Sequence, residues 1–391
     1  MNITIQPGKL RGTVAAIPSK SQAHRLLICA AFADKQTQLY CPQTNRDITA
    51  TVDCLNSLGA QITRTDWGYT IAPIHDLPKT ARLSCCESGS TLRFLLPIAG
   101  ALGVEATFCM EGRLPQRPLS PLWEDMERMG CRLTRPTENT ILCKGKLIPG
   151  EYQIDGGVSS QFITGLLLAL SILPQESRLT VTGKIESKPY IDITKQALRL
   201  FGVDPEHLGK QKFSTPGKLT VEGDWSNGAF FLAAKALGND LTITGLNSDS
   251  PQGDRAAESA LSDLVQGNTT ISAADIPDLV PILAVAAGAL RGAVFTQIAR
   301  LRLKESDRVA AVCSMITALG GKCEADENTL TVYPTGYIGG TVDAFGDHRI
   351  AMSAAIAATV CAEPVTILGA QAVEKSYPDF WAEYCRLGGI L

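Results

Sequence analysis

One pattern recurs six times along the chain, and it constrains the fold more than any single motif does. Each copy begins with small or polar residues, continues into an apolar helical run, and leads to a short β-branched strand, a second helix and further strands. The copies begin about 50 to 70 residues apart, a period typical of proteins built from repeated supersecondary units. The sequence therefore predicts an α/β fold assembled from six similar units.

The six copies share an opening in which a helix-starting residue precedes alanine, leucine and other apolar residues. The openings are SKSQAHRLLICAAFA from Ser19, ESGSTLRFLLPIAGALG from Glu87, VSSQFITGLLLALSIL from Val158, DWSNGAFFLAAKALG from Asp224, IPDLVPILAVAAGAL from Ile276, and GDHRIAMSAAIAATV from Gly346. Strands rich in β-branched residues are expected at similar offsets. They are LTVTG from 179, LTITG from 241, AVFTQ from 293 and VTILG from 365.

The two ends of the chain predict how the units group into domains. The last copy, residues 346–391, stops after its second helical segment, whereas the N-terminal residues are strand-like and have no helix of their own. We expect these strands to complete the sixth unit. With 391 residues, enough for two cores, this predicts one domain of residues 1–19 plus 223–391 and another of 20–222, each with three units. The chain would cross twice between them and form a hinge.

Composition excludes several classes of partner. The 36 Lys and Arg against 39 Asp and Glu give a net charge of -3, which offers no general attraction to nucleic acid or to an anionic membrane. The longest apolar stretches, Phe162–Leu173 and Leu279–Leu290, are shorter than the roughly 20 residues of a membrane span. The first residues lack the features of a secretory signal. We therefore expect a cytoplasmic protein, and a monomer by default.

Cysteine and histidine usage argues against a metal site. None of the 12 cysteines forms a CxxC pair, and the four histidines are scattered. Nearly all the cysteines lie in apolar runs, as expected of small buried residues that stay reduced. The sequence therefore predicts neither a metal ion nor a disulfide framework.

Charged residues gather where helices are expected to begin. A helix N-terminus presents free N–H groups and about half a positive charge, so it attracts anions. Ser, Asp and Gly are ordinary caps there, but a Lys or Arg opposes the dipole and costs up to about 1 kcal/mol unless an anion offsets it. We expect such placements at Lys20, Arg117, Lys304, Arg349 and Lys375. They predict a cleft that binds more than one multiply charged anion.

Ten short motifs, in order and spread over the whole chain, resemble those of the 5-enolpyruvylshikimate-3-phosphate synthase family. They are PSKSQAHR at 18–25, SGSTLR at 88–93, QRPL at 116–119, VSSQF at 158–162, SKPYIDIT at 187–194, VEGDWSNGAFF at 221–231, IPD at 276–278, LKESDR at 303–308, GDHRIAM at 346–352 and EKSYPDF at 374–380. The resemblance implies an inside-out α/β barrel of two domains that close over a substrate cleft. It also implies a reaction without cofactor or metal, in which phosphoenolpyruvate gives its enolpyruvyl group to the 5-hydroxyl of shikimate 3-phosphate.

The resemblance implies a role for each matched position. Shikimate 3-phosphate would bind to Lys20, Ser21, Arg25, Ser159, Ser160, Gln161, Ser187, Tyr190, Asp278 and Lys304. Phosphoenolpyruvate would bind to Lys20, Gly89, Arg117, Gln161, Arg308, Arg349 and Lys375. Two positions depart from the family pattern. Glu87 stands where family members commonly have Asn, and Arg300 stands where some members have a substrate-binding Asn. Because Gly89 is kept, the resemblance also implies sensitivity to glyphosate.

The chemistry of this reaction needs acids and bases beside the reacting carbons. Asp278 and Glu305 are the leading pair, and Lys20 can share either duty. We expect Asp278 to handle the 5-hydroxyl proton and Glu305 the proton at C3 of phosphoenolpyruvate. Burial and positive neighbours would together set the pKa of each carboxylate.

Four other functions remain as alternatives. The related transferases that act on UDP-N-acetylglucosamine have Asn after the first lysine, where this chain has Ser21, and commonly a cysteine near the position of Arg117, where EGRLPQRP has none. An RNA-end cyclase uses similar units, but the balanced charge provides no basic face for RNA. A binding-only anion sensor would not need both Asp278 and Glu305. A purely structural repeat protein would leave the positive helix starts unexplained.

Overall fold

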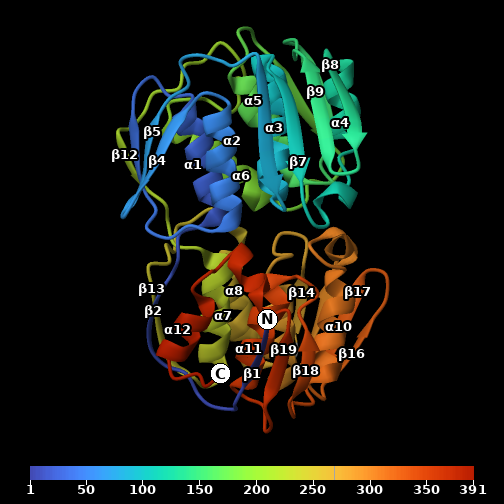
Figure 1. Ribbon diagram of the computed structural model, residues 1–391. Coiled ribbons are helices and arrows are strands. Elements are labelled where there is room, and N and C mark those ends of the chain that lie inside the picture. The colour runs from blue at the N-terminus through green and yellow to red at the C-terminus, as the bar shows by residue number, and fades with distance from the viewer. Residues whose placement is uncertain (268) are drawn as a thin grey trace. The chain divides into compact units, whose positions relative to one another are not determined.

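The computed structural model describes residues 1–267 and 269–391, and these form two compact units (Figure 1). The first, here the discontinuous unit, contains Met1–Ile17 and Glu222–Leu391. The second, here the central unit, is the continuous segment Pro18–Val221. Each unit has its own hydrophobic core of buried aliphatic and aromatic residues. Both helices and strands contribute to each unit, so the fold is α/β.

The central unit contains three sheets. Their strand orders are β12-β3-β5-β4, β6-β7-β9-β8 and β10-β11. The bounds are β3 Thr37–Tyr40, β4 Gln61–Thr65, β5 Gly68–Ala72, β6 Thr80–Cys86, β7 Glu105–Met110, β8 Cys131–Thr137, β9 Thr140–Gly145, β10 Glu151–Asp155, β11 Arg178–Thr182 and β12 Lys218–Thr220. Each sheet contains one parallel strand pair, namely β12/β3, β6/β7 or β10/β11. In the two larger sheets this pair is extended on one side by an antiparallel hairpin, β4/β5 or β8/β9.

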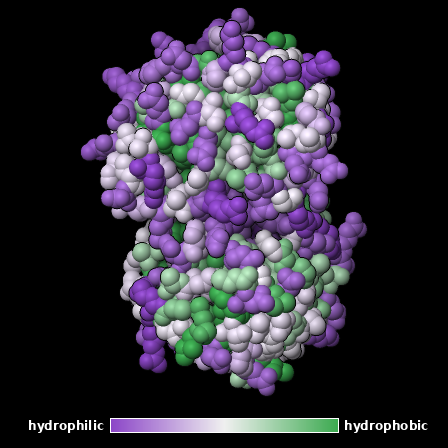
Figure 2. Space-filling model, viewed as in Figure 1, coloured by the Kyte–Doolittle hydropathy of each residue, from purple (hydrophilic) through white to green (hydrophobic). Residues whose placement is uncertain are grey.

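The helices of the central unit supply the middle of its core. They are α1 Lys20–Ala31, α2 Arg46–Ser57, α3 Gly89–Leu102, α4 Leu122–Arg128, α5 Ser160–Ser171 and α6 Lys188–Leu200, with the 3-10 turn η1 Leu114–Gln116. Nearly every residue of α3 and α5 is buried, and these two helices pack against each other. A helix that is apolar all round must lie inside the protein. In Figure 2 the visible face of this unit is mainly hydrophilic, because many of its apolar residues are buried in the core.

The discontinuous unit has three sheets among its described residues. Their strand orders are β1-β19-β18, β13-β2 and β14-β15-β17-β16. The bounds are β1 Asn2–Ile5, β2 Arg11–Ala15, β13 Asp240–Thr244, β14 Thr269–Ser272, β15 Ala293–Thr296, β16 Lys322–Ala325, β17 Thr329–Tyr333, β18 Gly340–Asp343 and β19 Val365–Leu368. The helices are α7 Trp225–Ala236, α8 Ala257–Gln266, α9 Val280–Ala289, α10 Arg308–Ala318, α11 His348–Ala358 and α12 Phe380–Arg386, with 3-10 turns η2 Gly253–Ala256, η3 Ala299–Leu303 and η4 Ala370–Lys375.

The N-terminal strands belong to the same unit as the C-terminal half of the chain. β1 pairs antiparallel with β19, and β2 pairs parallel with β13. A bridge between Gln6 and Ile390 joins the two ends of the chain. The unit is therefore complete only when both segments are present.

The elements expected from periodicity are present. Each of the six predicted openings leads into a helix, namely α1, α3, α5, α7, α9 and α11, and the four predicted strands are β11, β13, β15 and β19. The apolar stretch Phe162–Leu173 overlaps the buried helix α5, and Leu279–Leu290 contains the buried helix α9. Among the described residues, no helix combines the length and the apolarity that crossing a membrane requires.

Candidate functional site

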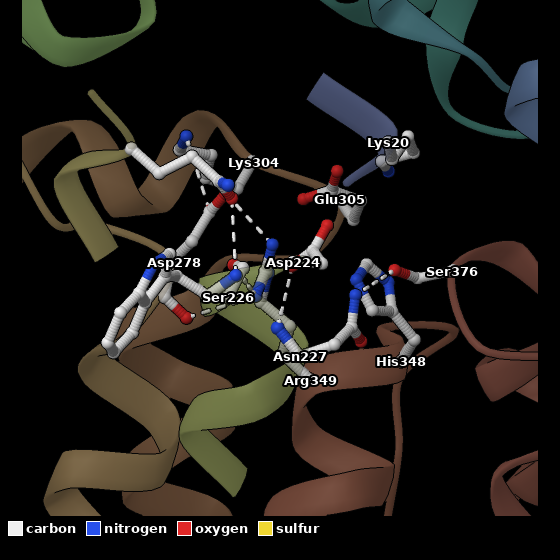
Figure 3. Close-up of polar contacts among 12 residues, drawn as sticks. Lys20, Asp224, Ser226, Asn227, Asp278, Lys304, Glu305, His348, Arg349 and Ser376 are labelled. Carbon is white, nitrogen blue, oxygen red and sulfur yellow. Dashed lines mark hydrogen bonds and ion pairs between the residues drawn. The ribbon is translucent and has the colours of Figure 1, made fainter. Parts of the chain in front are cut away.

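In the discontinuous unit, three of the sequence motifs meet at one carboxylate. Asp278 lies just before α9, and its Oδ1 is 2.7 Å from Arg308 Nη1 at the start of α10. Its Oδ2 is 2.9 Å from Arg349 Nη2 in the first turn of α11 (Figure 3). Lys304 Nζ is 3.6 Å from Asp278 Oδ1. The IPD, LKESDR and GDHRIAM motifs therefore converge, although they are far apart in the sequence.

The positive neighbours decide the protonation of Asp278. Burial alone would raise the pKa of its carboxyl group, but Arg349, Lys304 and Arg308 outweigh burial and hold this pKa well below its usual value. The carboxylate is therefore ionised, and it is held by charge-assisted hydrogen bonds from both arginines.

Arg308 is the most enclosed cation of this cluster. Its side chain is buried and is surrounded by three carboxylates: Asp278, Glu305 at 2.7 Å and Asp347 at 3.1 Å. Asp347 is also the N-cap of α11, where it accepts a hydrogen bond from the Arg349 backbone N–H. Since a buried guanidinium needs such partners, Arg308 ties together the starts of α9, α10 and α11.

In the central unit, Lys20 is the first residue of α1. Its Nζ is 2.9 Å from Asp47 Oδ2 in the first turn of α2. Asp47 had no predicted role, and its signal in the sequence is weak, because Asn45 alone marks the start of α2 as a cap. The ion pair shows that the positive charge of Lys20 at a helix start is offset by a neighbouring carboxylate.

Gly89 begins α3 and leaves room for two guanidinium groups. A Cβ at this position would lie 2.6 Å from Arg117 Nη1 and 2.7 Å from Arg93 Nη1. Arg93 in turn donates to Gln161 Oε1 at 3.1 Å, and Gln161 Nε2 donates to Ser90 Oγ. The structure thus brings together three predicted residues, Gly89, Arg117 and Gln161. Arg93, which was quoted in a motif but given no role, lies among them.

The remaining predicted residues of the central unit surround the starts of α5 and α6. Ser159 caps α5, and Ser160 is its first residue. Ser187 precedes α6 in the left-handed conformation, with φ of 54°, a strained geometry that is enriched at functional sites. Arg25 is buried and donates to Thr194, to Thr164 and to the backbone oxygen of Tyr190. It therefore fixes α1 to α5 and α6.

The prediction that five cations lie at helix starts is wrong for three of them. Arg117 and Lys304 each follow the end of a 3-10 turn, η1 and η3, and Lys375 is the last residue of η4. The C-terminal end of such a turn presents carbonyl groups, where a positive charge is favourable. The dipole penalty therefore applies to Lys20 and Arg349 but not to these three residues. The error arose because short turns before the second helices were taken as part of those helices.

The two departures from the family pattern lie at different places. Glu87 precedes α3, and its carboxylate lies against the backbone of Gly112, where a Cβ would meet Glu87 Oε1. Arg300 lies within η3, ahead of Lys304. All 12 cysteines are free thiols. In the described part of the chain, no group of three His, Cys, Asp or Glu side chains could hold a metal ion.

Comparison with known proteins identifies the family. The model of the family described as EPSP synthase (3-phosphoshikimate 1-carboxyvinyltransferase) matches residues 5–384. The chain belongs to this family. Among EPSP synthase relatives, 3-phosphoshikimate 1-carboxyvinyltransferase of Clostridium kluyveri is 38% identical, over 99% of this chain and 97% of the relative. The protein of the same name from Clostridioides difficile is 35% identical, over 99% and 98%.

Solved structures support the same fold. An EPSP synthase from Acinetobacter baumannii superposes with a TM-score of 0.79 at 22% identity, and covers 99% of this chain and 98% of its own. The enolpyruvyl transferase NikO from Streptomyces tendae gives a TM-score of 0.77 at 19% identity, over 100% and 98%. At this level of identity the likeness shows that the EPSP synthase fold is shared.

Proposed function

We propose that this member of the EPSP synthase family transfers the enolpyruvyl group of phosphoenolpyruvate to the 5-hydroxyl of shikimate 3-phosphate and releases phosphate. This reaction belongs to the shikimate pathway, which leads to chorismate and the aromatic amino acids. The observation that carries the proposal is the convergence of Arg308, Arg349 and Lys304 on the ionised Asp278. Such a cluster offers a base and several cations for anionic substrates.

We also propose the finer architecture, an inside-out α/β barrel in which each unit consists of three repeated βαβαββ-type parts. The buried helices α3 and α5, together with the three separate sheets of the central unit, support it. In such a barrel the parallel pair β12/β3 would join the ends of the central unit, and the parallel pair β13/β2 would join the ends of the discontinuous unit. Each of these pairs connects segments that are distant in the sequence.

The residue roles follow from the family motifs. We propose that shikimate 3-phosphate binds to Lys20, Ser21, Arg25, Ser159, Ser160, Gln161, Ser187, Tyr190, Asp278 and Lys304. We propose that phosphoenolpyruvate binds to Lys20, Gly89, Arg117, Gln161, Arg308, Arg349 and Lys375. The grouping of Gly89, Arg117 and Gln161 supports the second set, because guanidinium forks suit the two-point recognition of phosphate and carboxylate.

The proposed mechanism is addition followed by elimination. The 5-hydroxyl oxygen bonds to C2 of phosphoenolpyruvate and loses its proton to Asp278, while C3 gains a proton from Glu305 or Lys20. The C2–O bond to phosphate then breaks, C3 returns a proton to Glu305 or Lys20, and the cations stabilise the departing phosphate. Asp278 is a weak base while its cations hold it. When anionic substrates share Lys304 and Arg349, the pKa of Asp278 rises and its basicity increases.

Release of inorganic phosphate tests the proposal directly. Purified protein supplied with phosphoenolpyruvate and shikimate 3-phosphate should release phosphate, and replacing the acceptor with UDP-N-acetylglucosamine should abolish the release. The opposite acceptor preference would assign the chain to the other transferase. Binding of both ligands without release would indicate an anion sensor.

We further propose that the protein is a cytoplasmic monomer. Its free cysteines fit a reducing compartment. Light scattering at assay concentrations and cell fractionation would measure both properties, and a mass of twice 41.7 kDa would contradict the monomer.

A further inference from the structure

A chain of buried polar side chains lies about one turn below the starts of α1, α2 and α3 in the central unit. Its members are His24 on α1, Thr51 on α2, and Thr91 and Ser88 at the start of α3, and all four are fully buried. None of them was predicted to contact a substrate. The helix α2 packs against both α1 and α3 (Figure 1), so the chain crosses three neighbouring helices.

Three short hydrogen bonds join these side chains. His24 Nδ1 is 2.7 Å from Thr51 Oγ1, and Thr51 Oγ1 is 2.7 Å from Thr91 Oγ1. Thr91 Oγ1 donates to Ser88 Oγ at 2.8 Å, and Ser88 is the N-cap of α3. The chain therefore runs from α1 to the residue that precedes Gly89.

A count of hydrogens gives the chain one direction. Each threonine hydroxyl has a single hydrogen to donate. Thr91 gives its hydrogen to Ser88 Oγ or, at 3.4 Å, to the Asp47 backbone oxygen. In either case Thr91 accepts from Thr51, so Thr51 must accept from His24. His24 is therefore the donor at the head of the chain, through Nδ1–H.

The other ring nitrogen of His24 shows that this donor has a cost. Burial lowers the pKa of His24 to about 3, so the ring is neutral and Nε2 carries no hydrogen. Within the described residues the buried Nε2 has no hydrogen-bond partner. An apolar side chain here would avoid an unsatisfied nitrogen. The Nδ1 donor, rather than the stability of the core, therefore accounts for a histidine at this position.

His24 and its neighbour Arg25 connect α1 to different helices. Arg25 donates to side chains of α5 and α6, whereas His24 leads to α2 and α3. In the proposed function, α1, α5 and α6 carry the residues of the central unit that bind shikimate 3-phosphate, and α3 carries none of them. Phosphoenolpyruvate would bind to Lys20 at the start of α1 and to Gly89 at the start of α3. The chain from His24 therefore joins two helix starts that only phosphoenolpyruvate would contact together.

We propose that His24, Thr51 and Thr91 are positioning residues for phosphoenolpyruvate, because their directed hydrogen bonds set the first turn of α3 relative to that of α1. This inference rests on the proposed function, in which Lys20 and Gly89 bind phosphoenolpyruvate. It adds three residues that act through these helix starts without touching the substrate.

Other contacts share the task of holding these helix starts. The ion pair of Lys20 with Asp47 joins α1 to α2, and Gln161 donates to Ser90 Oγ and so joins α5 to α3. Both contacts remain when the chain is broken. Such variants should therefore fold and bind phosphoenolpyruvate several-fold more weakly, without losing binding altogether.

Paired substitutions at Thr51, the middle of the chain, test the inference by steady-state kinetics. Thr51→Val keeps the shape and removes the hydroxyl, so KM for phosphoenolpyruvate should rise about 5-fold, while kcat and KM for shikimate 3-phosphate stay within about 2-fold. Thr51→Ser keeps the hydroxyl and should restore KM to within about 2-fold of wild type. The matched control is Ser171→Ala, which removes another buried hydroxyl of the central unit, one that donates to the Leu167 backbone oxygen.

Substitutions of His24 test the donor itself. His24→Asn places an amide N–H near the position of Nδ1, whereas His24→Leu has no donor. Both variants lose the packing of the ring, so a smaller rise in KM for phosphoenolpyruvate in His24→Asn reports the hydrogen bond. Thermal unfolding separates stability from positioning, because Ser171→Ala should lower the melting temperature without changing either KM.

The tautomer of His24 can be observed directly. Long-range proton–nitrogen correlations from protein with isotope-labelled histidine distinguish a protonated Nδ1 from a protonated Nε2, and the signals absent from His24→Asn identify the ring. We expect Nδ1 to be protonated and Nε2 to be bare at neutral pH. The opposite tautomer would overturn the direction of the chain.

The kinetic outcomes separate this inference from the proposed function. Wild-type protein that releases no phosphate from the two substrates contradicts the proposed function, and the tautomer result stands without it. An active wild type contradicts the positioning role alone if Thr51→Val has an unchanged KM for phosphoenolpyruvate, or if KM rises equally for both substrates.

Discussion

Asp278 and Lys20 show at the scale of single residues how charged side chains are paired within each unit. Asp278 is surrounded by three cations, and Lys20 is paired with Asp47. In both cases an ion pair keeps a charged group ready at a position where it is partly shielded from water. Under the proposed function, the anionic substrates would compete with these pairs.

Loss of Lys20 should reduce turnover strongly. Lys20→Ala removes a positioned positive charge, and we expect kcat to fall by at least about 100-fold. The control is Lys35→Ala, an exposed lysine beyond the end of α1. Phosphate release measured at saturating substrate decides the outcome, and a near-normal rate would remove Lys20 from the proposed site.

Loss of Asp278 should separate binding from chemistry. Asp278→Ala should fold, bind shikimate 3-phosphate and turn over very slowly, because the proposed base for the 5-hydroxyl is gone. Arg308 keeps Glu305 and Asp347 as partners, so its charge stays compensated. Equilibrium binding and a single-turnover assay measure the two properties, and turnover as fast as wild type would show that another base acts.

Asp254 should make stability depend on pH. Its pKa is raised to about 7 by burial and by Asp278, so between pH 4 and 7 the folded state binds more protons than the unfolded state. Stability therefore falls as pH rises through this range. Asp254→Asn cannot ionise, so its stability relative to wild type should increase from pH 5 to pH 8. Urea unfolding at both values measures this, with Asp263→Asn as the flat reference.

At the scale of elements, helix starts place the polar groups. Ser88 caps α3 and accepts a hydrogen bond from the Thr91 backbone N–H, so Gly89 becomes the first helical residue. The absence of a side chain at Gly89 lets Arg93 and Arg117 approach the backbone closely. The same feature would admit an anion at the free N–H groups of the helix.

A methyl group at Gly89 should disturb binding without unfolding the protein. In Gly89→Ala the Cβ would lie under 3 Å from two guanidinium ends, which can move because they are the tips of flexible side chains. We expect KM for phosphoenolpyruvate to rise by about 10-fold while the melting temperature changes little. Gly217→Ala measures the effect of an added methyl group elsewhere, since nothing lies near its Cβ, although its positive φ adds strain. A normal KM in Gly89→Ala would contradict the proposed role.

At the scale of the whole molecule, the chain ends close one unit onto itself. β1 and β2 pair with β19 and β13, and Gln6 pairs with Ile390. Ile5, Leu10 and Val14 contribute to the core of the discontinuous unit. A fragment that lacks the N-terminal strands would therefore expose both a core surface and two strand edges.

A permuted fragment should fold where a truncated one does not. Residues 222–391 followed by a short Gly/Ser linker and residues 1–17 restore every strand pair of the unit, whereas residues 222–391 alone leave β13 without its partner β2 and β19 without its partner β1. Circular dichroism and cooperative urea unfolding compare the two. A truncated fragment as stable as the permuted one would show that the N-terminal strands contribute little.

The sequence by itself determined the starts of six helices and several strands, because local periodicity and capping depend on residues only a few positions apart. It predicted α1, α3, α5, α7, α9 and α11 as well as β11, β13, β15 and β19. The family motifs likewise gave Asp278, Arg308 and Arg349 as candidate site residues without any structure.

Only the tertiary structure decided which of these groups meet. Asp278 and Arg349 are 71 residues apart, and Ser226 and Arg349 are 123 apart, so no local pattern pairs them. The same is true of Asp254, whose charged neighbours Asp278 and Arg349 come from other elements, and of Arg117, Lys304 and Lys375, whose turns were taken for helix starts. Contacts between distant segments depend on how helices and strands pack, and that packing is set by the whole core.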